Sequence, residues 1–212
     1  MTETRVAAAE RRAGGDRRQE IIDAAAEIFA AKGYDATSIQ DIAEAVDILK
    51  GSLYYHIDSK EDLLFEVIQE VHESGLERLE ALEKSTAPAL DRIADFVRLH
   101  VEYNAHALIK IAVFFHDFRS LKGERRKTIV EERDVYDHRL RDLIRQGQEE
   151  GSICPGIDPK IGAFAILGMM NWMYQWYNPS GEQSPAELAD EFAQMAVRSV
   201  ACPGRDHLGH GG

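Results

Sequence analysis

The sequence predicts an all-α protein, with an N-terminal three-helix domain that contains a helix-turn-helix and a larger C-terminal helical domain. Apolar residues recur at intervals of three or four in most segments after residue 16, which is the spacing of one helix face. Helix-capping pairs precede several of these segments, as Ser59 with Asp62 and Ser184 with Glu187 do. Together the two patterns predict helices along nearly the whole chain.

The composition bounds the class of protein. With 212 residues, 44% hydrophobic and 29% charged, the chain has the size and balance of an ordinary soluble protein of one domain or two small ones. Its net charge of −12 does not exclude nucleic acid, because only the surface that meets the phosphates must be positive. We expect no secretory signal and no membrane span, and therefore a cytoplasmic location.

The N-terminal region divides into an arm and a helix. Residues 1–15 mix Arg, Glu, Ala and Gly without apolar periodicity, and we expect a disordered arm whose arginines either stay solvated or reach DNA. From Asp16 a helix is expected, and Gly33 ends it. Its apolar face consists of Ile21, Ile22, Ala25, Ile28 and Phe29.

Residues 37–65 have the pattern of a helix-turn-helix. Thr37 or Ser38 caps a first short helix, with Gln40 or Asp41 as the reciprocal partner, and Asp47 marks the turn. The second short helix is expected to bury Leu49, Leu53 and Ile57. The residues expected to face outward are Lys50, Gly51, Ser52, Tyr54, Tyr55 and His56. The second helix of such a pair fits a DNA major groove.

The residues expected to face outward favour a DNA-binding role over a purely structural turn. Gly51 and Ser52 allow a close approach to phosphate, and Lys50 and Lys60 supply positive charge. Helix-turn-helix pairs without DNA are common, so geometry alone leaves both readings open. The DNA-binding candidates are Thr37, Ser38, Gln40, Lys50, Gly51, Ser52, Leu53, Tyr54, Tyr55, His56 and Lys60.

Three sequence motifs in the N-terminal region resemble those of a known protein family. They are Ile-Ile-Asp-Ala-Ala-Ala-Glu-Ile-Phe-Ala-Ala-Lys-Gly-Tyr-Asp-Ala-Thr-Ser, Lys-Gly-Ser-Leu-Tyr-Tyr-His and Asp-Ser-Lys-Glu-Asp-Leu-Leu. In this order they resemble the DNA-binding domain of the TetR family of bacterial repressors, over residues 17–70. The resemblance implies a symmetric homodimer on a palindromic operator. Two positions depart from the family pattern. Asp47 replaces the usual Gly of the turn, which should survive because Asp tolerates a left-handed backbone. Leu49 replaces a small capping residue, and it could instead pack or contact a thymine methyl group.

Longer helices are expected after the helix-turn-helix. Their ranges are residues 59–82, 89–118 with a possible kink at 104–107, 124–150, 161–177 and 184–199. The first of them runs out of the DNA-binding module with no Gly/Ser-rich linker, so we expect the two domains to be mechanically coupled. The expected domains are residues 16–65 and 66–203, followed by an unstructured tail at 204–212.

Asp158 and Pro159 are expected to open the next helix as N-cap and first-turn pair. Over residues 161–177 this helix is apolar on all sides, since only Asn171 and Gln175 are strongly polar. Such a helix must be covered all round, and one side can pack on the core of its own domain. A second copy of the chain is the simplest cover for the other side, in an intersubunit four-helix bundle with the last helix. The interface candidates are Gly168, Met170, Tyr174, Leu188, Phe192 and Met195.

A ligand site is one of two readings of the polar and aromatic residues in the second half. His100 and Asn104 interrupt an apolar stripe, either as satisfied core residues or as residues that face a pocket. The aromatic and Met residues are either plain core or the lining of an apolar cavity. The candidates are His100, Tyr103, Asn104, Leu108, Phe114, Phe115, Phe118, Phe164, Met169, Trp172, Met173 and Trp176.

The second half carries a further resemblance. Phe-Phe-His-Asp-Phe-Arg-Ser-Leu at 114–121 and Asn-Trp-Met-Tyr-Gln-Trp-Tyr-Asn-Pro at 171–179, followed by Ser-Pro-Ala-Glu-Leu-Ala-Asp-Glu-Phe, resemble TetR regulators of lipid and steroid catabolism. Members of that group respond to acyl-CoA thioesters, which implies an acyl-CoA effector. The alternative is a small lipophile or drug that controls an efflux gene.

Other classes are less well supported. The chain lacks GxSxG, GxGxxG, GxxxxGK[ST] and HExxH, so we expect no enzyme and no cofactor. The spacing of His100, His106 and His116 does not favour a metal site. Cys154 and Cys202 lie far apart without CxxC spacing, and we expect two unpaired thiols. A helical dimeric adaptor that uses the N-terminal module for protein contacts remains a rival, and it would not retard DNA.

Overall fold

The computed structural model describes residues 2–202, without the side chains of residues 2–16, 81 and 83. The expected unstructured tail at 204–212 lies outside this range. Within the described residues the structure is helical, and the β-type pairing is limited to an isolated antiparallel bridge between Ile153 and Ala201. The prediction of an all-α fold is confirmed for this part of the chain.

The chain forms two compact units. The first runs to Val71 and takes in Ile109–Ile129, whereas the second holds His72–Leu108 and the chain from Val130 onward. The sequence predicted a single boundary after residue 65. The difference arises because Val113 and Phe114 are buried in the same apolar cluster as the N-terminal helices. Helical periodicity shows that a face is apolar, but it does not show which core that face joins.

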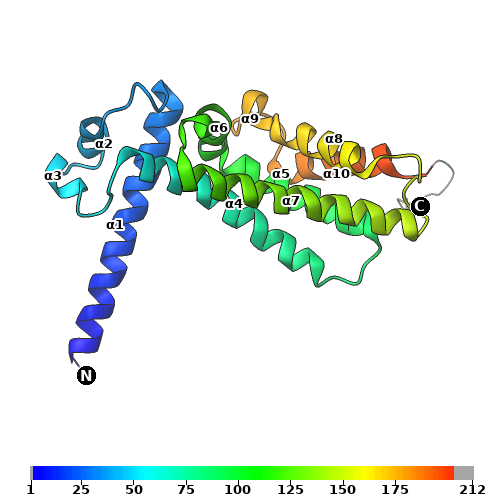
Figure 1. The fold of residues 1–212 in the computed structure, drawn as a ribbon, viewed down its shortest axis with the longest axis horizontal. Coiled ribbons are helices and arrows are strands. Elements are labelled where there is room, and N and C mark those ends of the chain that lie inside the picture. Colours follow the sequence, from blue (N-terminus) through cyan, green and yellow to red (C-terminus); the bar gives the residue numbers. More distant parts are fainter. Residues whose placement is uncertain (1, 203–212) are drawn as a thin grey trace. The chain divides into compact units, whose positions relative to one another are not determined.

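The first unit contains the N-terminal helices and a segment that returns to them (Figure 1). Its helices are α1 (Thr2–Lys32), α2 (Ile39–Ala45), α3 (Lys50–Leu53), the first turns of α4 (Lys60–Glu83), most of α6 (Leu108–Asp117), the 3-10 helix η1 (Phe118–Ser120) and the start of α7 (Gly123–Glu149). Because α1 begins at Thr2, residues 2–15 are helical where the sequence predicted a disordered arm. Ala, Arg and Glu make up most of residues 2–12, and all three have high helix propensity.

The turn between α2 and α3 has the backbone that the sequence predicts. Ser38 is the N-cap of α2, and Asp41 completes the capping box. Asp47 takes the left-handed conformation at φ 51, so it replaces the glycine usual in the family without loss of the turn. Leu49 is the N-cap of α3 and forms no side-chain cap hydrogen bond.

Ion pairs tie the helices of the first unit together around its apolar core. The Lys110 Nζ on α6 lies 2.6 Å from Asp23 Oδ1 on α1 and 2.5 Å from Glu70 Oε2 on α4. An ion pair between Arg125 and Asp62 joins the start of α7 to the start of α4. These contacts hold α6 and the start of α7 against α1 and the start of α4.

The second unit is a helical bundle around α5 (Ala89–His106), which packs against α8 (Pro159–Asn171), α9 (Met173–Trp176) and α10 (Pro185–Val200). Figure 1 shows these helices together, with the remaining turns of α4 and α7. The kink predicted near 104–107 is confirmed as a break at Ala107. The single helix predicted for 161–177 is wrong, because the Gln175 amide bonds back three residues to Trp172 and the chain tightens there.

The caps of the last helices agree with the sequence patterns. Asp158 accepts hydrogen bonds from the amides of Lys160 and Ile161 at the start of α8. Ser184 and Glu187 form a capping box at the start of α10. None of the helices in the described residues is both long enough and apolar enough to cross a membrane.

Candidate functional site

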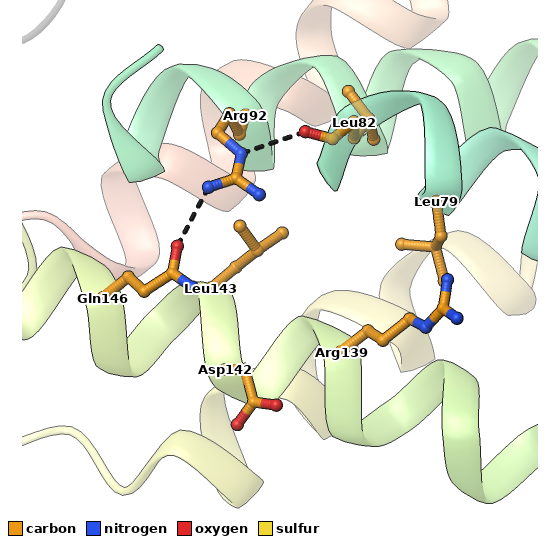
Figure 2. Close-up of a pocket in the computed structure, with 7 residues that line it drawn as sticks. All are labelled: Leu79, Leu82, Arg92, Arg139, Asp142, Leu143 and Gln146. Atoms are coloured by element: carbon orange, nitrogen blue, oxygen red, sulfur yellow. Dashed lines mark hydrogen bonds between the residues drawn. The ribbon is translucent and has the colours of Figure 1, made fainter. Parts of the chain in front are cut away.

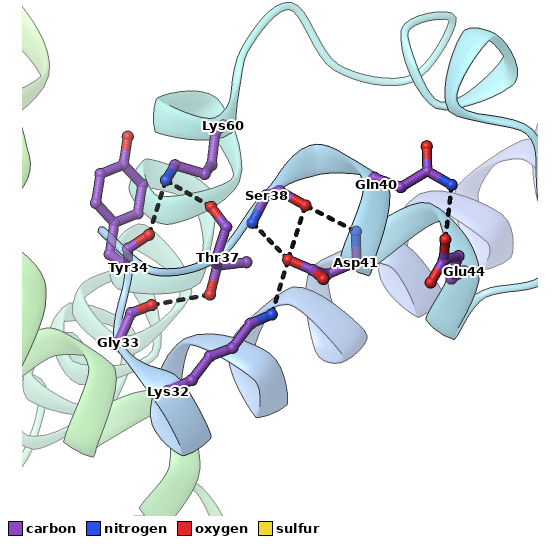
Figure 3. A network of polar contacts seen from close by, with 9 residues as sticks. All are labelled: Lys32, Gly33, Tyr34, Thr37, Ser38, Gln40, Asp41, Glu44 and Lys60. Carbon is purple, nitrogen blue, oxygen red and sulfur yellow. Dashed lines mark hydrogen bonds and ion pairs between the residues drawn. The ribbon is translucent and has the colours of Figure 1, made fainter.

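A network of polar contacts fixes the entry to the helix-turn-helix (Figure 3). The Asp41 amide donates to Ser38 Oγ at 3.2 Å, and the Ser38 amide donates to the Asp41 carboxylate at 2.7 Å. Lys32 Nζ lies 2.7 Å from the same carboxylate. The hydrogen bonds from Lys32 and Ser38 hold the pKa of Asp41 far below its usual value, so this carboxylate is charged at all ordinary pH. Ser38 and Asp41 therefore serve mainly to start α2.

Two of the predicted DNA-binding residues brace the fold instead. Thr37 is buried, and its hydroxyl donates to the Gly33 carbonyl at 2.8 Å. Lys60 Nζ donates to the carbonyls of Tyr34 and Thr37, each at 2.7 Å, and lies 4.2 Å from the centre of the Tyr34 ring. This corrects the prediction that Thr37 faces DNA, because its side chain is buried and already bonded, while Lys60 has two of its three Nζ donors engaged within the protein.

The outer surface of α3 and its flanks carries the remaining candidates. Lys50 and Gly51 are exposed, and so are Tyr54 at 49% and Tyr55 at 89%. Leu49 is 80% exposed, which corrects the prediction that it faces inward. We call Leu49, Lys50, Gly51, Ser52, Tyr54 and Tyr55 the recognition surface. A Cβ at Gly51 would meet no atom within 4 Å, so the backbone there is open to a close approach.

The other candidates lie beside this surface or beneath it. Leu53 is fully buried beneath α3, so its side chain is part of the core and not of the recognition surface. Gln40 is exposed on α2, where its amide donates to Glu44 at 2.8 Å. His56 is half-buried, and its carbonyl accepts a hydrogen bond from Arg18. Ser38 is exposed at the start of α2.

A polar cluster of three residues lies inside the second unit. His100 Nδ1 lies 2.5 Å from the Tyr136 hydroxyl, and His100 Nε2 lies 3.1 Å from Asn171 Oδ1. Burial lowers the pKa of His100 to about 4, and burial also raises the pKa of Tyr136. The imidazole and the phenol are therefore neutral at pH 7. A neutral imidazole that donates from Nε2 to Asn171 Oδ1 and accepts at Nδ1 from the Tyr136 hydroxyl pairs both ring nitrogens.

Aromatic and cationic residues surround this cluster. The guanidinium of Arg78 lies 3.9 Å from the centre of the Tyr103 ring. Burial lowers the pKa of Arg78. A Cβ at Gly75 would lie 3.1 Å from the Tyr136 ring, so α4 approaches the cluster closely at this position. Asn104 is buried beside these residues in the bundle, and its amide donates to the Met170 carbonyl at 3.1 Å.

A cavity of about 140 Å³ lies between α4, α5 and α7 in the same unit (Figure 2). Its lining residues are Leu79, Leu82, Arg92, Arg139, Asp142, Leu143 and Gln146. Arg92 donates to the Leu82 carbonyl at 3.2 Å and to Gln146 at 2.9 Å. Arg139 is one helical turn after Tyr136 on α7, so the cavity adjoins the polar cluster. The cavity is smaller than ordinary ligand sites of roughly 300 Å³ or more.

Several predicted ligand residues lie elsewhere. Phe114 and Phe118 pack in the apolar cluster of the first unit, and Phe115 is exposed on α6. Trp172 and Trp176 are 61% and 49% exposed. Of the rest, Met173 is in the core, Met169 packs on it, Leu108 is half-buried and Phe164 is exposed. His100, Tyr103 and Asn104 are therefore the candidates that the structure brings together.

The side of α8, α9 and α10 that does not pack on the core of the second unit is an exposed apolar face. We define it by its large exposed side chains, Ile161, Phe164, Trp172, Trp176 and Met195. Gly168 is also exposed and Tyr174 is half-buried. Met170, Leu188 and Phe192 are buried in the core of their own unit, which corrects their assignment to a dimer interface. The predicted interface residues that stay accessible in the structure are Gly168, Tyr174 and Met195.

Together these features define a class of protein. A helix-turn-helix whose exposed second helix carries Lys50 is joined to a helical bundle that has a half-buried polar cluster and an exposed apolar face. This combination is typical of a one-component regulator, which binds DNA with one unit and a small molecule with the other.

Comparison with known proteins agrees with this class. Residues 21–67 match the model of the bacterial regulatory proteins of the tetR family, and residues 86–200 match a tetracyclin repressor-like C-terminal domain. The chain belongs to the TetR family, and it is a TetR-type transcriptional repressor.

Three relatives cover most of the chain. The HTH-type transcriptional repressor KstR2 of Rhodococcus jostii is 30% identical over 203 residues, which are 88% of this chain and 92% of that protein. The structure of the ketosteroid transcriptional regulator KstR2 of Mycobacterium tuberculosis is 26% identical, with a TM-score of 0.83 over 88% of this chain and 95% of that one. The structure of AibR with isovaleryl coenzyme A and operator DNA is 29% identical, with a TM-score of 0.76 over 84% and 97%.

Proposed function

We propose that this protein is a ligand-responsive homodimeric repressor that acts in the cytoplasm without catalysis. Each protomer presents one recognition surface to a palindromic operator, and an acyl-CoA thioester of lipid or steroid catabolism releases the dimer. The observation that carries the proposal is the joint occurrence of an exposed α3 and an uncovered apolar face on α8 to α10.

The DNA step rests on the chemistry of the recognition surface. Lys50 supplies a positive charge, the Tyr54 and Tyr55 hydroxyls supply donors, and Gly51 leaves the backbone open. Leu49, with its exposed isobutyl group, suits contact with a thymine methyl group. Affinity for DNA then depends strongly on salt, because phosphate contacts release counterions.

The dimer step rests on the exposed apolar face. Soluble monomers rarely leave a contiguous set of large apolar side chains uncovered. Two copies of the α8 to α10 face, related by a two-fold axis, would bury Phe164 and Trp172 against each other in a four-helix bundle. The same two-fold axis matches a palindromic operator, whose half-sites lie roughly 34 Å apart or a multiple of that distance.

The effector step rests on the interior of the second unit. The neutral cluster of His100, Tyr136 and Asn171 offers donors and acceptors to a thioester carbonyl, and the adjoining cavity has Arg92 and Arg139 in its lining. A bulky acyl-CoA would have to enlarge this space. The bound acyl-CoA would thereby displace α4, which follows the helix-turn-helix directly. It would favour a dimer geometry in which the two recognition helices lie farther apart.

A fluorescent operator duplex tests the effector class. We expect at least one thioester in a panel of steroid-acid, branched short-chain and long-chain acyl-CoAs to release the duplex and to raise the thermal midpoint, while the matching free acid does neither. No response to any thioester, together with release by a cationic lipophilic drug, would instead assign the protein to efflux control. An adaptor would bind no duplex in the absence of ligand.

A further inference from the structure

The two cysteines lie at one end of the second unit, where the chain after α7 meets the chain after α10. The antiparallel bridge between Ile153 and Ala201 holds these two segments together. The Cys154 amide donates to the Val200 carbonyl at 3.0 Å, and the Cys202 amide donates to the Ser152 carbonyl at 3.3 Å. Two hydrogen bonds thus fix the register that places Cys154 and Cys202 diagonally across the bridge.

This register brings the two side chains to the same side. Side chains alternate across an extended chain, so residues 154 and 202, each one position beyond the bridged pair, point to the same face. The neighbouring Cys202 side chain, together with burial, raises the pKa of the Cys154 thiol. Cys154 Sγ also lies 3.8 Å from the Ala201 carbonyl. Both thiols are free and partly exposed.

We propose that Cys154 and Cys202 form a reversible dithiol–disulfide site that fastens the end of α10 to the turn between α7 and α8. The oxidant is a low-molecular-weight disulfide. One cysteine thiolate attacks it and releases one small thiol, and the second cysteine attacks the resulting mixed disulfide and releases the other. The small disulfide gains two electrons, and the two cysteine protons end on the two released thiols.

The consequence of oxidation is local and mechanical. The new bond closes the part of the chain that contains α8, α9 and α10, and closing a long loop restricts the unfolded state. The bond joins two segments that the Ile153 and Ala201 bridge already holds side by side. In the reducing cytoplasm proposed for this repressor, the disulfides that do form are usually transient and redox-responsive.

The test uses the full chain in mixtures of reduced and oxidised glutathione. We expect alkylation mapping to show both thiols lost together in one chain, with an intact mass lower by two hydrogens. The thermal midpoint should rise by on the order of 5 °C and return on reduction. Cys154→Ser and Cys202→Ser, each shown to fold by circular dichroism, should accumulate only mixed or intermolecular disulfides and show no such rise.

Two results would overturn the proposal. One is oxidised wild-type protein in which the disulfide joins two chains. The other is protein that keeps both thiols, or only mixed disulfides with glutathione, across the whole range of mixtures. Neither outcome depends on DNA or on an acyl-CoA. Failure of the redox proposal would therefore leave the proposed repressor function unaffected, and the reverse also holds.

Discussion

Lys60 and Lys50 are both lysines of the helix-turn-helix, but their surroundings give them different roles. Lys60 Nζ is held by the carbonyls of Tyr34 and Thr37, while Lys50 extends into solvent from α3. Lys60→Met should lower the free energy of unfolding by about 2 kcal/mol, because two charge-assisted hydrogen bonds are lost and two carbonyls lose their donor. Urea unfolding measures this loss.

Lys50→Met is the matched control for that prediction. It should change the free energy of unfolding by less than about 0.5 kcal/mol, since the side chain is exposed. It should nevertheless weaken DNA binding. Equal destabilisation by the two substitutions would contradict the assignment of Lys60 as a brace.

His100 makes the stability of the second unit depend on pH. Its pKa falls from 6.5 in the unfolded chain to about 4 in the fold because of burial, so the unfolded chain binds the proton more tightly. The stabilisation is fully present above pH 6.5 and is lost as the pH falls toward 4, by at most about 3 kcal/mol. Denaturation at a series of pH values measures this loss.

His100→Gln tests the source of that pH dependence. Glutamine keeps a donor and an acceptor near Tyr136 and Asn171 but does not titrate. The variant should therefore lose less stability than the wild type between pH 6.5 and 4. His72, whose pKa burial and Arg133 also lower to about 4, should account for part of the remaining slope. An unchanged slope would show that His100 is not the titrating group.

At the scale of the helix, α3 starts without a side-chain cap. Leu49 occupies the N-cap position, and its side chain lies in solvent. Leu49→Ser should stabilise the protein by about 1 kcal/mol relative to Leu49→Ala, because the serine hydroxyl can accept an amide hydrogen bond at the start of α3. Chemical denaturation of both variants measures the difference. Equal stability of the two would mean that the start of α3 has no free amide to satisfy.

The sequence predicted best those elements whose signals are local. The capping boxes at Ser38 and Ser184, the Asp158 cap and the left-handed turn at Asp47 all depend on residues within one helical turn, and all are present. The break at Trp172 was not predicted, because the surrounding residues continue the apolar pattern without interruption. The helical start at Thr2 was missed because the arm has no apolar face.

The candidate sites were harder to predict because they depend on tertiary contacts. Leu49 was expected inside and Thr37 outside, and the structure reverses both. Phe114 has the same apolar signal whether it packs in one unit or in the other. Cys154 and Cys202 meet only because the ends of α7 and α10 pair, and no spacing within the sequence reveals that contact.

At the scale of the whole molecule, the exposed apolar face predicts self-association. Phe164→Glu should shift the protein from dimer to monomer, since the interface would lose a large apolar side chain and would have to desolvate a carboxylate. Arg141 and Lys160 lie near the Phe164 ring and should keep the monomer folded. Sedimentation velocity measures the change.

Val135→Glu is the control for that shift. Val135 is 43% exposed on α7 and lies outside the α8 to α10 face, so its substitution should leave the dimer intact. A wild-type protein that sediments as a monomer at micromolar concentration would remove the basis for a two-fold operator.

The most direct test of the central claim is the salt dependence of binding to a duplex selected from the source genome. We predict that the wild type binds such a duplex tightly at low salt, and that log K falls linearly with log salt concentration. Lys50→Met should reduce that slope by about 2 per dimer, one phosphate contact from each protomer. The absence of binding to any duplex at low ionic strength, or an unchanged slope in the variant, would contradict the assignment of α3 as the element that meets DNA.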